Sequence, residues 1–238
     1  MKTSLIILFK NEIEYVKLTM ESTHSYLSNK EIDFELIAVD DSTDGTWEFL
    51  QSFANLHPNV IVVKGEEPSG YGKALLKGFS VATGDIFIPF NGDLSDSLDD
   101  VYSYINLIEN GYDMVFGSRY MNGAKVTNSI AIKEKISQLG NKFLQILFIT
   151  NCSDITNSFK AYKKTVIEDI NPIVNGYHIG LEIALKGITM KYRYTTIPVT
   201  WTGREFGYSK MSMLKVIPRY LFTALQIKFF YSSSHRIR

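Results

Sequence analysis

Short, continuous apolar runs alternate with helix-length segments through the first half of the chain. The expected strands are residues 4–9, 34–39, 60–63, 85–90 and 112–116, and the segments between them are expected to be helices at 12–27, 46–53, 71–82 and 99–109. Unbroken hydrophobicity is typical of strands covered on both faces. Alternation at this spacing predicts right-handed βαβ units, and so an α/β fold with a mostly parallel sheet flanked by helices.

The second half of the chain is less regular. It predicts helices at 130–149 and 178–186, short strands at 158–162 and 191–200, and a final helix at 211–230. From Met211 onward every charged residue is basic. We therefore divide the chain into a domain of residues 1–210 and a basic amphipathic C-terminal helix and tail of residues 211–238. Such a helix either lies on an anionic membrane surface or packs against the domain.

Composition excludes several classes of protein. The chain has 238 residues, of which 45% are apolar, and its 25 basic residues balance 25 acidic ones. This neutral balance argues against a nucleic-acid-binding protein, which needs a broad basic field. The single cysteine, Cys152, excludes an internal disulfide framework, and no apolar stretch approaches the roughly 18 residues of a membrane span. We expect a cytoplasmic protein, with the final helix as its candidate contact to the cytoplasmic membrane face.

Polar residues follow four of the expected strands. They are Asn11-Glu12, Asp40-Asp41, Asn91-Gly92-Asp93 and Ser118-Arg119. Each group alone is also ordinary turn or capping chemistry. Because parallel strands bring their carboxyl ends to one edge of the sheet, and ligands bind there, the four groups together favour a binding site.

The Asn91-Gly92-Asp93 turn is the sharpest of these signals. Oxygen ligands at Asn91 and Asp93 can face one hard divalent ion, Mg²⁺ or Mn²⁺, whose other ligands are water and diphosphate oxygens. Asp40 and Asp41 could accept hydrogen bonds from a nucleobase or ribose, or cap the next helix. Gly72 and Lys73, in the sequence Gly70-Tyr71-Gly72-Lys73, open the third helix, where a helix N-terminus attracts anions.

In this order the motifs resemble the signature of family 2 glycosyltransferases. They are Val39 to Thr46, Gly70 to Ala74, Asn91 to Ser95 and Gly117 to Tyr120. The later motifs resemble the dolichol-phosphate mannose synthase group, which transfers sugars to polyprenyl phosphates. These are Asp154 to Tyr162, Gly180 to Ile183, Ile197 to Val199 and Arg204 to Lys210.

The resemblance implies a GT-A fold and an inverting transfer of a hexose from GDP-mannose or a UDP-sugar to a polyprenyl phosphate, with Mg²⁺ or Mn²⁺. Its implied catalytic residues are Asp93, Arg119 and Arg204, and its implied metal ligands are Asn91 and Asp93. The nucleotide sugar would be bound by Asn11, Glu12, Asp40, Asp41, Gly72, Lys73, Asn91 and Asp93. The acceptor and its phosphate would be bound by Arg119, Lys133, Lys160, Glu182, Arg204, Ser209 and Lys210.

Two departures keep alternatives open. Asn91 stands where the family has the first Asp of Asp-x-Asp, which removes one negative charge from the metal site. Lys160 stands where the group has Arg, and the two cations are not equivalent at a phosphate. A hydroxyl acceptor would need a carboxylate base, for which Asp154, Asp96 and Glu182 are the candidates. A sugar nucleotidyltransferase or a nucleotide-sugar-binding protein without turnover are the remaining hypotheses, and oligomeric state is not predicted.

Overall fold

The computed structural model describes residues 1–65, 70–203 and 213–231. Its strands are β1 (Thr3–Phe9), β2 (Phe34–Asp40), β3 (Val60–Lys64), β4 (Ile86–Asn91), β5 (Met114–Ser118), β6 (Lys125–Thr127), β7 (Lys160–Lys163), β8 (Tyr194–Pro198) and β9 (Thr200–Thr202). Its helices are α1 (Ile13–Asn29), α2 (Thr46–Leu56), α3 (Tyr71–Val81), α4 (Leu98–Glu109), α5 (Ala131–Phe148), α6 (Lys164–Ile170), α7 (Ile179–Thr189) and α8 (Met213–Gln226), which continues as a π-helical turn over Ile227–Tyr231.

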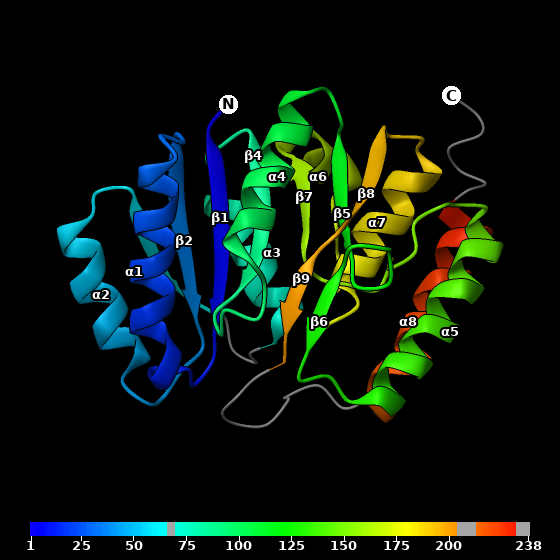
Figure 1. Ribbon diagram of the computed structural model, residues 1–238, viewed down its shortest axis with the longest axis horizontal. Helices are drawn as coiled ribbons and strands as arrows, with labels where there is room; N and C mark the ends of the chain where they lie inside the picture. Colours follow the sequence, from blue (N-terminus) through cyan, green and yellow to red (C-terminus); the bar gives the residue numbers. More distant parts are fainter. Residues whose placement is uncertain (66–69, 204–212, 232–238) are drawn as a thin grey trace.

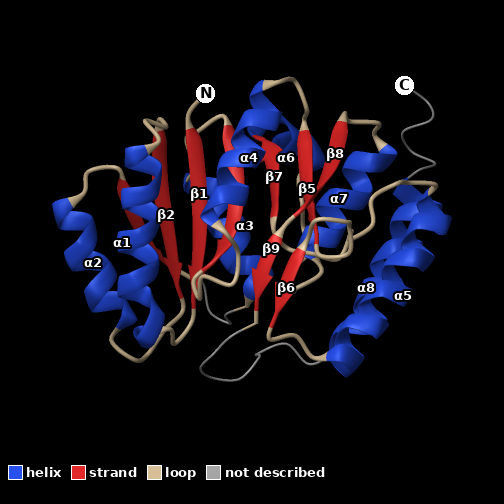
Figure 2. Cartoon of the chain, in the orientation of Figure 1, coloured by secondary structure: helices blue, strands red, loops and turns tan. Residues whose placement is uncertain are grey.

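A seven-stranded sheet forms the middle of the molecule, with the strand order β3-β2-β1-β4-β7-β5-β8. Only β7 runs antiparallel to its neighbours, β4 and β5. Helices α1, α2 and α4 cover one face of this sheet, and α3, α6 and α7 cover the other (Figures 1 and 2). The predicted α/β fold, a mostly parallel sheet between helices, is confirmed.

The two covered faces explain why the strand sequences are continuously apolar. On β1, the side chain of Ile6 belongs to the core beneath α3, whereas Leu5 and Ile7 belong to the core beneath α1 and α4. All three side chains are completely buried. Because successive side chains of a strand point to opposite faces, a strand between two cores must be apolar at every position.

Strand register brings the expected site residues to one edge. Phe9, the last residue of β1, pairs with Asp40 on β2, and Leu8 pairs with Asn91 on β4. Neighbouring strands lie about 4.8 Å apart, so Asp40 and Asn91 flank the end of β1 at a backbone separation of roughly 10 Å. A ligand the size of a diphosphate could span the separation between Asp40 and Asn91.

The structure differs from the sequence prediction in three short elements. Residues 191–200, predicted as one strand, form β8 and then β9, which leaves the large sheet and pairs with β6. Neither β6 nor α6 was predicted. β6 has three residues and an exposed face, and α6 has seven residues, so neither carries a periodic signal of its own.

The C-terminal helix packs on the domain with one stripe and exposes the other. Thr223, Ala224 and Ile227 are buried against the core, and the Tyr220 hydroxyl donates to the Tyr177 carbonyl at 3.0 Å. Phe222 and Phe230 are exposed. In the described part of the chain, no helix combines the length and apolarity needed to cross a bilayer. The boundary predicted at residue 210 lies outside the described residues.

A buried carboxylate joins three segments at the opposite edge of the sheet. Glu35, on β2, accepts hydrogen bonds from the Ser4 hydroxyl at 2.7 Å, the Lys2 ammonium at 2.6 Å and the Thr83 amide at 2.6 Å. Burial raises the pKa of Glu35, but the bonds from Lys2, Ser4 and Thr83 outweigh it and lower the pKa to about 2.

We predict that Glu35→Gln lowers the free energy of unfolding at pH 7 by about 2 kcal/mol, because bonds to a charged acceptor are lost. A lowered native pKa stabilises the fold above the unfolded value of about 4.5, and this contribution fades as the pH falls towards 2. Urea unfolding from pH 7 to pH 2 should show the wild type and variant converging. Asp33→Asn, at an exposed position beside the same strand, is the control. A difference independent of pH would contradict the assignment.

Candidate active site

The loops after β1 and β2 are joined by hydrogen bonds through Asn11. Its backbone adopts a left-handed conformation with φ of 51°, which asparagine tolerates better than most residues. Its backbone N–H donates to the Ser42 hydroxyl at 2.7 Å, and its side-chain oxygen accepts from the Thr43 backbone N–H at 2.9 Å. Asn11 therefore holds the two strand-end loops together.

Of the acidic residues beside this junction, Asp40 and Glu12 are buried and Asp41 is half-buried. Asp40 is fully buried, where it accepts from the Ser42 amide at 3.1 Å and pairs with Lys64 at 3.3 Å. The Asp41 carboxylate occupies the space that a side chain at Gly65 would fill, since an added Cβ there would lie 1.6 Å from Asp41 Oδ1. Glu12, buried at the start of α1, completes the group of acidic residues at this end of the sheet.

The turn after β4 lies directly against the end of β1. A Cβ at Gly92 would lie 2.6 Å from the Phe9 ring and 2.8 Å from the Leu8 carbonyl oxygen, so only glycine permits this approach. The Gly92 carbonyl accepts from Thr19 at 2.8 Å, and Asp93 Oδ1 accepts from the Ser95 amide at 3.1 Å. Asp93 is thereby fixed at the strand-end edge.

Asp96 follows in the same turn and is bound by Asn91. The side-chain amide of Asn91 donates to Asp96 Oδ2 at 2.8 Å. Burial raises the pKa of the Asp96 carboxyl to about 7, and repulsion from Asp93 adds to this, while Arg119 and the bonds from Asn91 act in the opposite direction. The predicted ligand pair Asn91 and Asp93 thus has a third polar member, Asp96.

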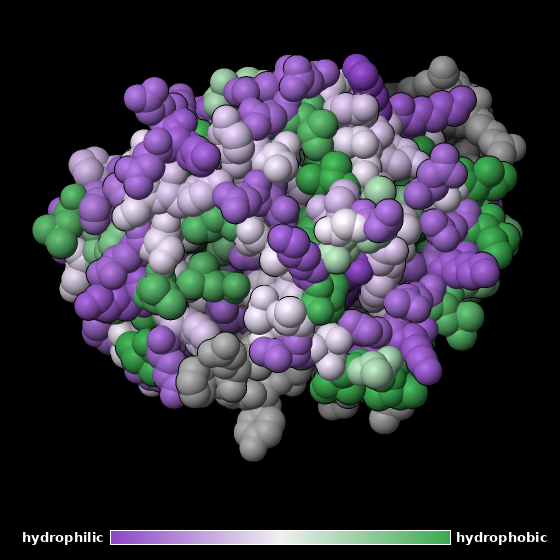
Figure 3. All heavy atoms as spheres, in the orientation of Figure 1, coloured by the Kyte–Doolittle hydropathy of each residue, from purple (hydrophilic) through white to green (hydrophobic). Residues whose placement is uncertain are grey.

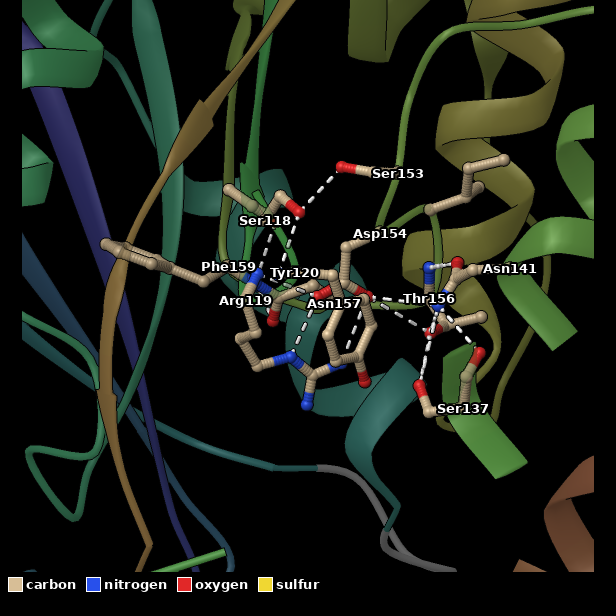
Figure 4. Close-up of polar contacts among 12 residues, drawn as sticks. Ser118, Arg119, Tyr120, Ser137, Asn141, Ser153, Asp154, Thr156, Asn157 and Phe159 are labelled. Atoms are coloured by element: carbon tan, nitrogen blue, oxygen red, sulfur yellow. Dashed lines mark hydrogen bonds and ion pairs between the residues drawn. The ribbon is translucent and has the colours of Figure 1, made fainter. Parts of the chain in front are cut away.

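Arg119, at the end of β5, is held by Asp154 (Figure 4). Its Nε and Nη2 donate to the two carboxylate oxygens of Asp154 at 2.8 and 3.0 Å, and its backbone amide donates at 3.1 Å. Asn141 Nδ2, from α5, also donates to Asp154 at 3.2 Å. Burial lowers the pKa of Arg119, but Asp154 outweighs it and raises the pKa well above its ordinary value. The guanidinium is a fixed, permanent cation.

Of the carboxylates considered as general bases, two are fully engaged elsewhere. Asp154 is completely buried and serves Arg119. Glu182 accepts from Lys186 at 2.6 Å and from the Val174 amide at 2.9 Å, which fastens the segment before α7 to that helix. Asp96 remains as the candidate whose second oxygen has no hydrogen-bond partner among the described residues.

The expected phosphate-binding lysines differ in their surroundings. Lys160 is completely buried, and its ammonium donates to the carbonyls of Ile155, at 3.0 Å, and Asn157. Burial lowers the pKa of Lys160 to about 8. The Lys160 ammonium therefore stabilises the loop before β7. Lys73 and Lys133 differ from Lys160 in burial, because they are only half-buried, in the first turns of α3 and α5.

Gly72 packs against the chain rather than lining an open loop. A Cβ at Gly72 would lie 2.4 Å from the Asn175 carbonyl carbon, so the glycine allows α3 to approach the segment before α7. Arg204, Ser209 and Lys210 lie outside the described residues, and their roles stay predictions.

The sequence interpretation missed the polar side chains that hold Asp154. Asn141 Nδ2 donates to the Thr156 hydroxyl at 2.9 Å, and its oxygen accepts from the Thr156 amide at 3.1 Å. Ser137 lies four residues before Asn141 on α5 and shares this network (Figure 4). The sequence signal for this network was the spacing of Ser137 and Asn141, two polar residues four positions apart that share one face of an amphipathic helix.

Among the described residues, no three histidine, cysteine or acidic side chains gather closely enough to hold a metal by themselves. Mg²⁺ usually binds one or two carboxylates and completes its shell with water and substrate phosphates. Asp93 and Asp96 match that chemistry, with the Asn91 amide beside them.

A parallel sheet with one reversed strand and acidic residues at its strand ends is the GT-A arrangement, and known proteins match it. The model of "Glycosyl transferase family 2" matches residues 4–170. Dolichol-phosphate mannosyltransferase of Pyrococcus furiosus is 34% identical over 89% of this chain, which spans 59% of that relative's length. Polyprenol monophosphomannose synthase of Mycolicibacterium smegmatis is 28% identical, over 89% of this chain and 81% of the relative. Glucosyl-3-phosphoglycerate synthase of Mycobacterium tuberculosis, solved with Mn²⁺, UDP and phosphoglyceric acid, gives a TM-score of 0.71 at 17% identity, over 95% of this chain and 78% of that one.

The chain belongs to glycosyl transferase family 2. The predictions of this family and of the GT-A fold are confirmed, and the enzyme class that they imply is that of the glycosyltransferases. This family favours sugar transfer over the nucleotidyl transfer that the sequence left open.

We predict that Asp154→Asn lowers the free energy of unfolding by about 3 kcal/mol, because Arg119 is left as an incompletely paired charge. Urea denaturation measures the change. Glu168→Gln removes a carboxylate from an exposed pair with Lys164 at 3.9 Å and should cost less than about 1 kcal/mol. Equal effects of the two substitutions would show that the Asp154 pair is no more important than a surface pair.

Proposed function

We propose that this protein transfers a hexose, mannose in the first instance, from a nucleotide diphosphate sugar to a polyprenyl phosphate. The observation that carries the proposal is the meeting of buried carboxylates and a fixed arginine at one sheet edge. Asp40 lies on one side of the β1 end, Asp93 lies on the other, and Arg119 is near enough to Asp96 to oppose its charge. The acceptor class is taken from the names of the similar mannosyltransferases.

The donor's diphosphate would lie at this edge, with its nucleoside towards Glu12, Asp40 and Asp41. Buried carboxylates can accept hydrogen bonds from ribose or base, and the bonds of Asn11 fix the loops that carry them. A divalent ion bound by Asp93 and its neighbours would neutralise charge on the leaving diphosphate.

Arg119 is proposed to position phosphate at the reacting centre. Asp154 fixes the plane of the guanidinium, so its orientation requires no reorganisation when substrate arrives. A phosphate acceptor is ionised at neutral pH and attacks the anomeric carbon without a general base. This agrees with the engagement of Asp154 and Glu182 in structural contacts. Arg204 and Lys210 are proposed to add positive charge for the same phosphates.

A membrane-facing surface is the second part of the proposal. On α5 the apolar side chains of Ile132, Ile136, Leu139, Phe143 and Ile146 are all exposed, at the spacing of one helical stripe. On α8 and the π-helical turn that follows it, an apolar groove of about 430 Å³ is lined by Phe222, Leu225, Gln226, Phe229 and Phe230. Lys228 lies 5.5 Å from the Phe148 ring centroid, which brings the ends of these helices together.

The exposed apolar side chains of α5 lie at one end of the molecule, where apolar residues are interspersed with charged ones on the visible surface and α8 lies behind α5 (Figures 1 and 3). Lysines flank the α5 stripe at Lys133, Lys135 and Lys142, and every charged residue of the C-terminal segment is basic. An apolar stripe between basic residues suits an anionic bilayer surface, from which a polyprenyl phosphate would be drawn. We propose peripheral attachment to the cytoplasmic membrane face.

The transfer assay combines purified protein, radiolabelled GDP-mannose or a UDP-hexose, a polyprenyl phosphate in detergent, and Mg²⁺ or Mn²⁺. We expect labelled lipid with one of these donors, and we expect Asp93→Asn to lower kcat by at least about 100-fold, because charge develops on the diphosphate. Asp99→Asn, an exposed charge removal on α4, should leave the rate unchanged. Full activity of Asp93→Asn would refute the metal role, and transfer only to hydroxyl acceptors would refute the lipid phosphate.

The membrane contact is tested by sedimentation with phosphatidylglycerol vesicles. The double variant Leu139→Ser and Ile146→Ser should lower the partition coefficient by at least about tenfold, because two apolar side chains no longer enter the bilayer. The matched control is Leu18→Ser with Leu56→Ser, which changes two other apolar residues that are more than half exposed, on α1 and α2. Equal losses in the two double variants would contradict a specific membrane-facing surface.

A further inference from the structure

The cation site proposed above lacks one of the charges that the family's motif supplies. Asn91 occupies the first position of Asp-x-Asp, so the motif itself carries a single carboxylate, Asp93. Removing a negative charge weakens the attraction of a site for a divalent ion. The structure places another acidic side chain, Asp96, against the substituted residue.

The Asn91 amide is oriented by Asp96. Its Nδ2 donates to Asp96 Oδ2 at 2.8 Å and lies 3.4 Å from the Ser95 hydroxyl. An aspartate at position 91 could not donate here, because an ionised carboxylate only accepts hydrogen bonds. Asn91 and Asp96 are therefore complementary as a pair, in a way that two aspartates would not be.

The other oxygen of Asp96 is unsatisfied by the residues that the structure describes. Asp96 is 4% exposed, and its Oδ1 has no hydrogen-bond partner among the described residues. The equally buried Glu35 and Asp154 have partners for both carboxylate oxygens. Leaving a buried carboxylate oxygen unpaired is costly, and the loss is recovered when a ligand occupies the position.

The charges that face Asp96 favour a cation as this ligand. Asp93 lies near enough to repel it. Arg119 attracts it, but Nε and Nη2 of Arg119 are bonded to Asp154. A hard divalent ion would offset the repulsion between the Asp93 and Asp96 carboxylates. It would also give Asp96 Oδ1 a partner, because such ions bind oxygen and take their remaining ligands from water and diphosphate.

We propose that Asp96 supplies the second carboxylate of the divalent-cation site, with Asp93 as the first, and that Asn91 positions Asp96. The negative charge of the family motif has thus moved from its first position to a residue five positions later. This inference rests on the proposed function, because it assumes that a divalent ion binds beside Asp93.

The test is Mn²⁺ binding to the full chain, followed by the electron paramagnetic resonance signal of free Mn²⁺, with GDP, with UDP and without nucleotide. We expect Asp96→Asn to raise the Mn²⁺ dissociation constant at least about tenfold. Asn91→Asp combined with Asp96→Asn should restore it to within about threefold of wild type, because the charge returns to the motif. Asp99→Asn, the same charge change on an exposed side chain of α4, should have no effect.

Two results would overturn the inference: an Asp96→Asn protein that binds Mn²⁺ within twofold of wild type, or a double variant that binds as weakly as Asp96→Asn. Asp93→Asn separates this failure from that of the proposed function. If Asp93→Asn loses Mn²⁺ and Asp96→Asn does not, only the role of Asp96 is wrong. If neither loses Mn²⁺, the proposed metal site itself is wrong.

Thermal unfolding provides a second readout. Mn²⁺ should raise the Tm of the wild type and of the double variant by more than that of Asp96→Asn, because the stabilisation by a bound ion falls as its dissociation constant rises. In the absence of metal, Asp96→Asn should be as stable as wild type, since it removes a buried charge. Should Asp96→Asn fail to fold, Asp96→Ser takes its place, and an equal Mn²⁺-induced rise in Tm for Asp96→Ser and wild type would refute the proposal.

Discussion

The pairing of a fully buried carboxylate, Asp154, with Arg119 is the interaction on which the rest of the site depends. Asp154 precedes β7, Arg119 follows β5, and Asn141 reaches the same carboxylate from α5. A buried charge must be matched closely to be tolerated, so the two oxygens fix three segments of the chain at once. The result is a guanidinium whose orientation is set before any ligand arrives.

Three buried carboxylates differ in how many of their oxygens have hydrogen-bond partners. Glu35 accepts hydrogen bonds at both oxygens and Asp154 has an arginine, so both contribute to stability. Within the described part of the chain, Asp96 accepts at one oxygen only, next to Asp93 and Asn91. Since unsatisfied buried carboxylate oxygens are rare in folded proteins, this oxygen is the basis of the cation site that we propose.

Much of the fold could be predicted from the sequence because its signals are local. The core strands are apolar at every position, and the turn residues stand at strand ends, so the sheet and the gathering of Asp40, Asn91 and Asp93 at one edge followed. The short elements could not be predicted in this way. β6 forms because β9 pairs with it, and this pairing depends on the path of the folded chain. The apolar stripe of α5 is ordinary amphipathic sequence, and only the packing around α5 shows that the stripe is exposed.

The sequence alone determined the class of fold, the family and the edge of the sheet at which the polar strand-end residues gather, because hydrophobic periodicity and strand-end motifs require no knowledge of distant contacts. Only the tertiary structure decided which charged side chains are engaged within the protein. Lys160 donates to carbonyls, and Glu182 accepts from amides and Lys186, whereas one oxygen of Asp96 has no hydrogen-bond partner in the segments that the structure describes. Hydrogen-bond satisfaction depends on partners that are far apart in sequence, and only folding brings them within reach.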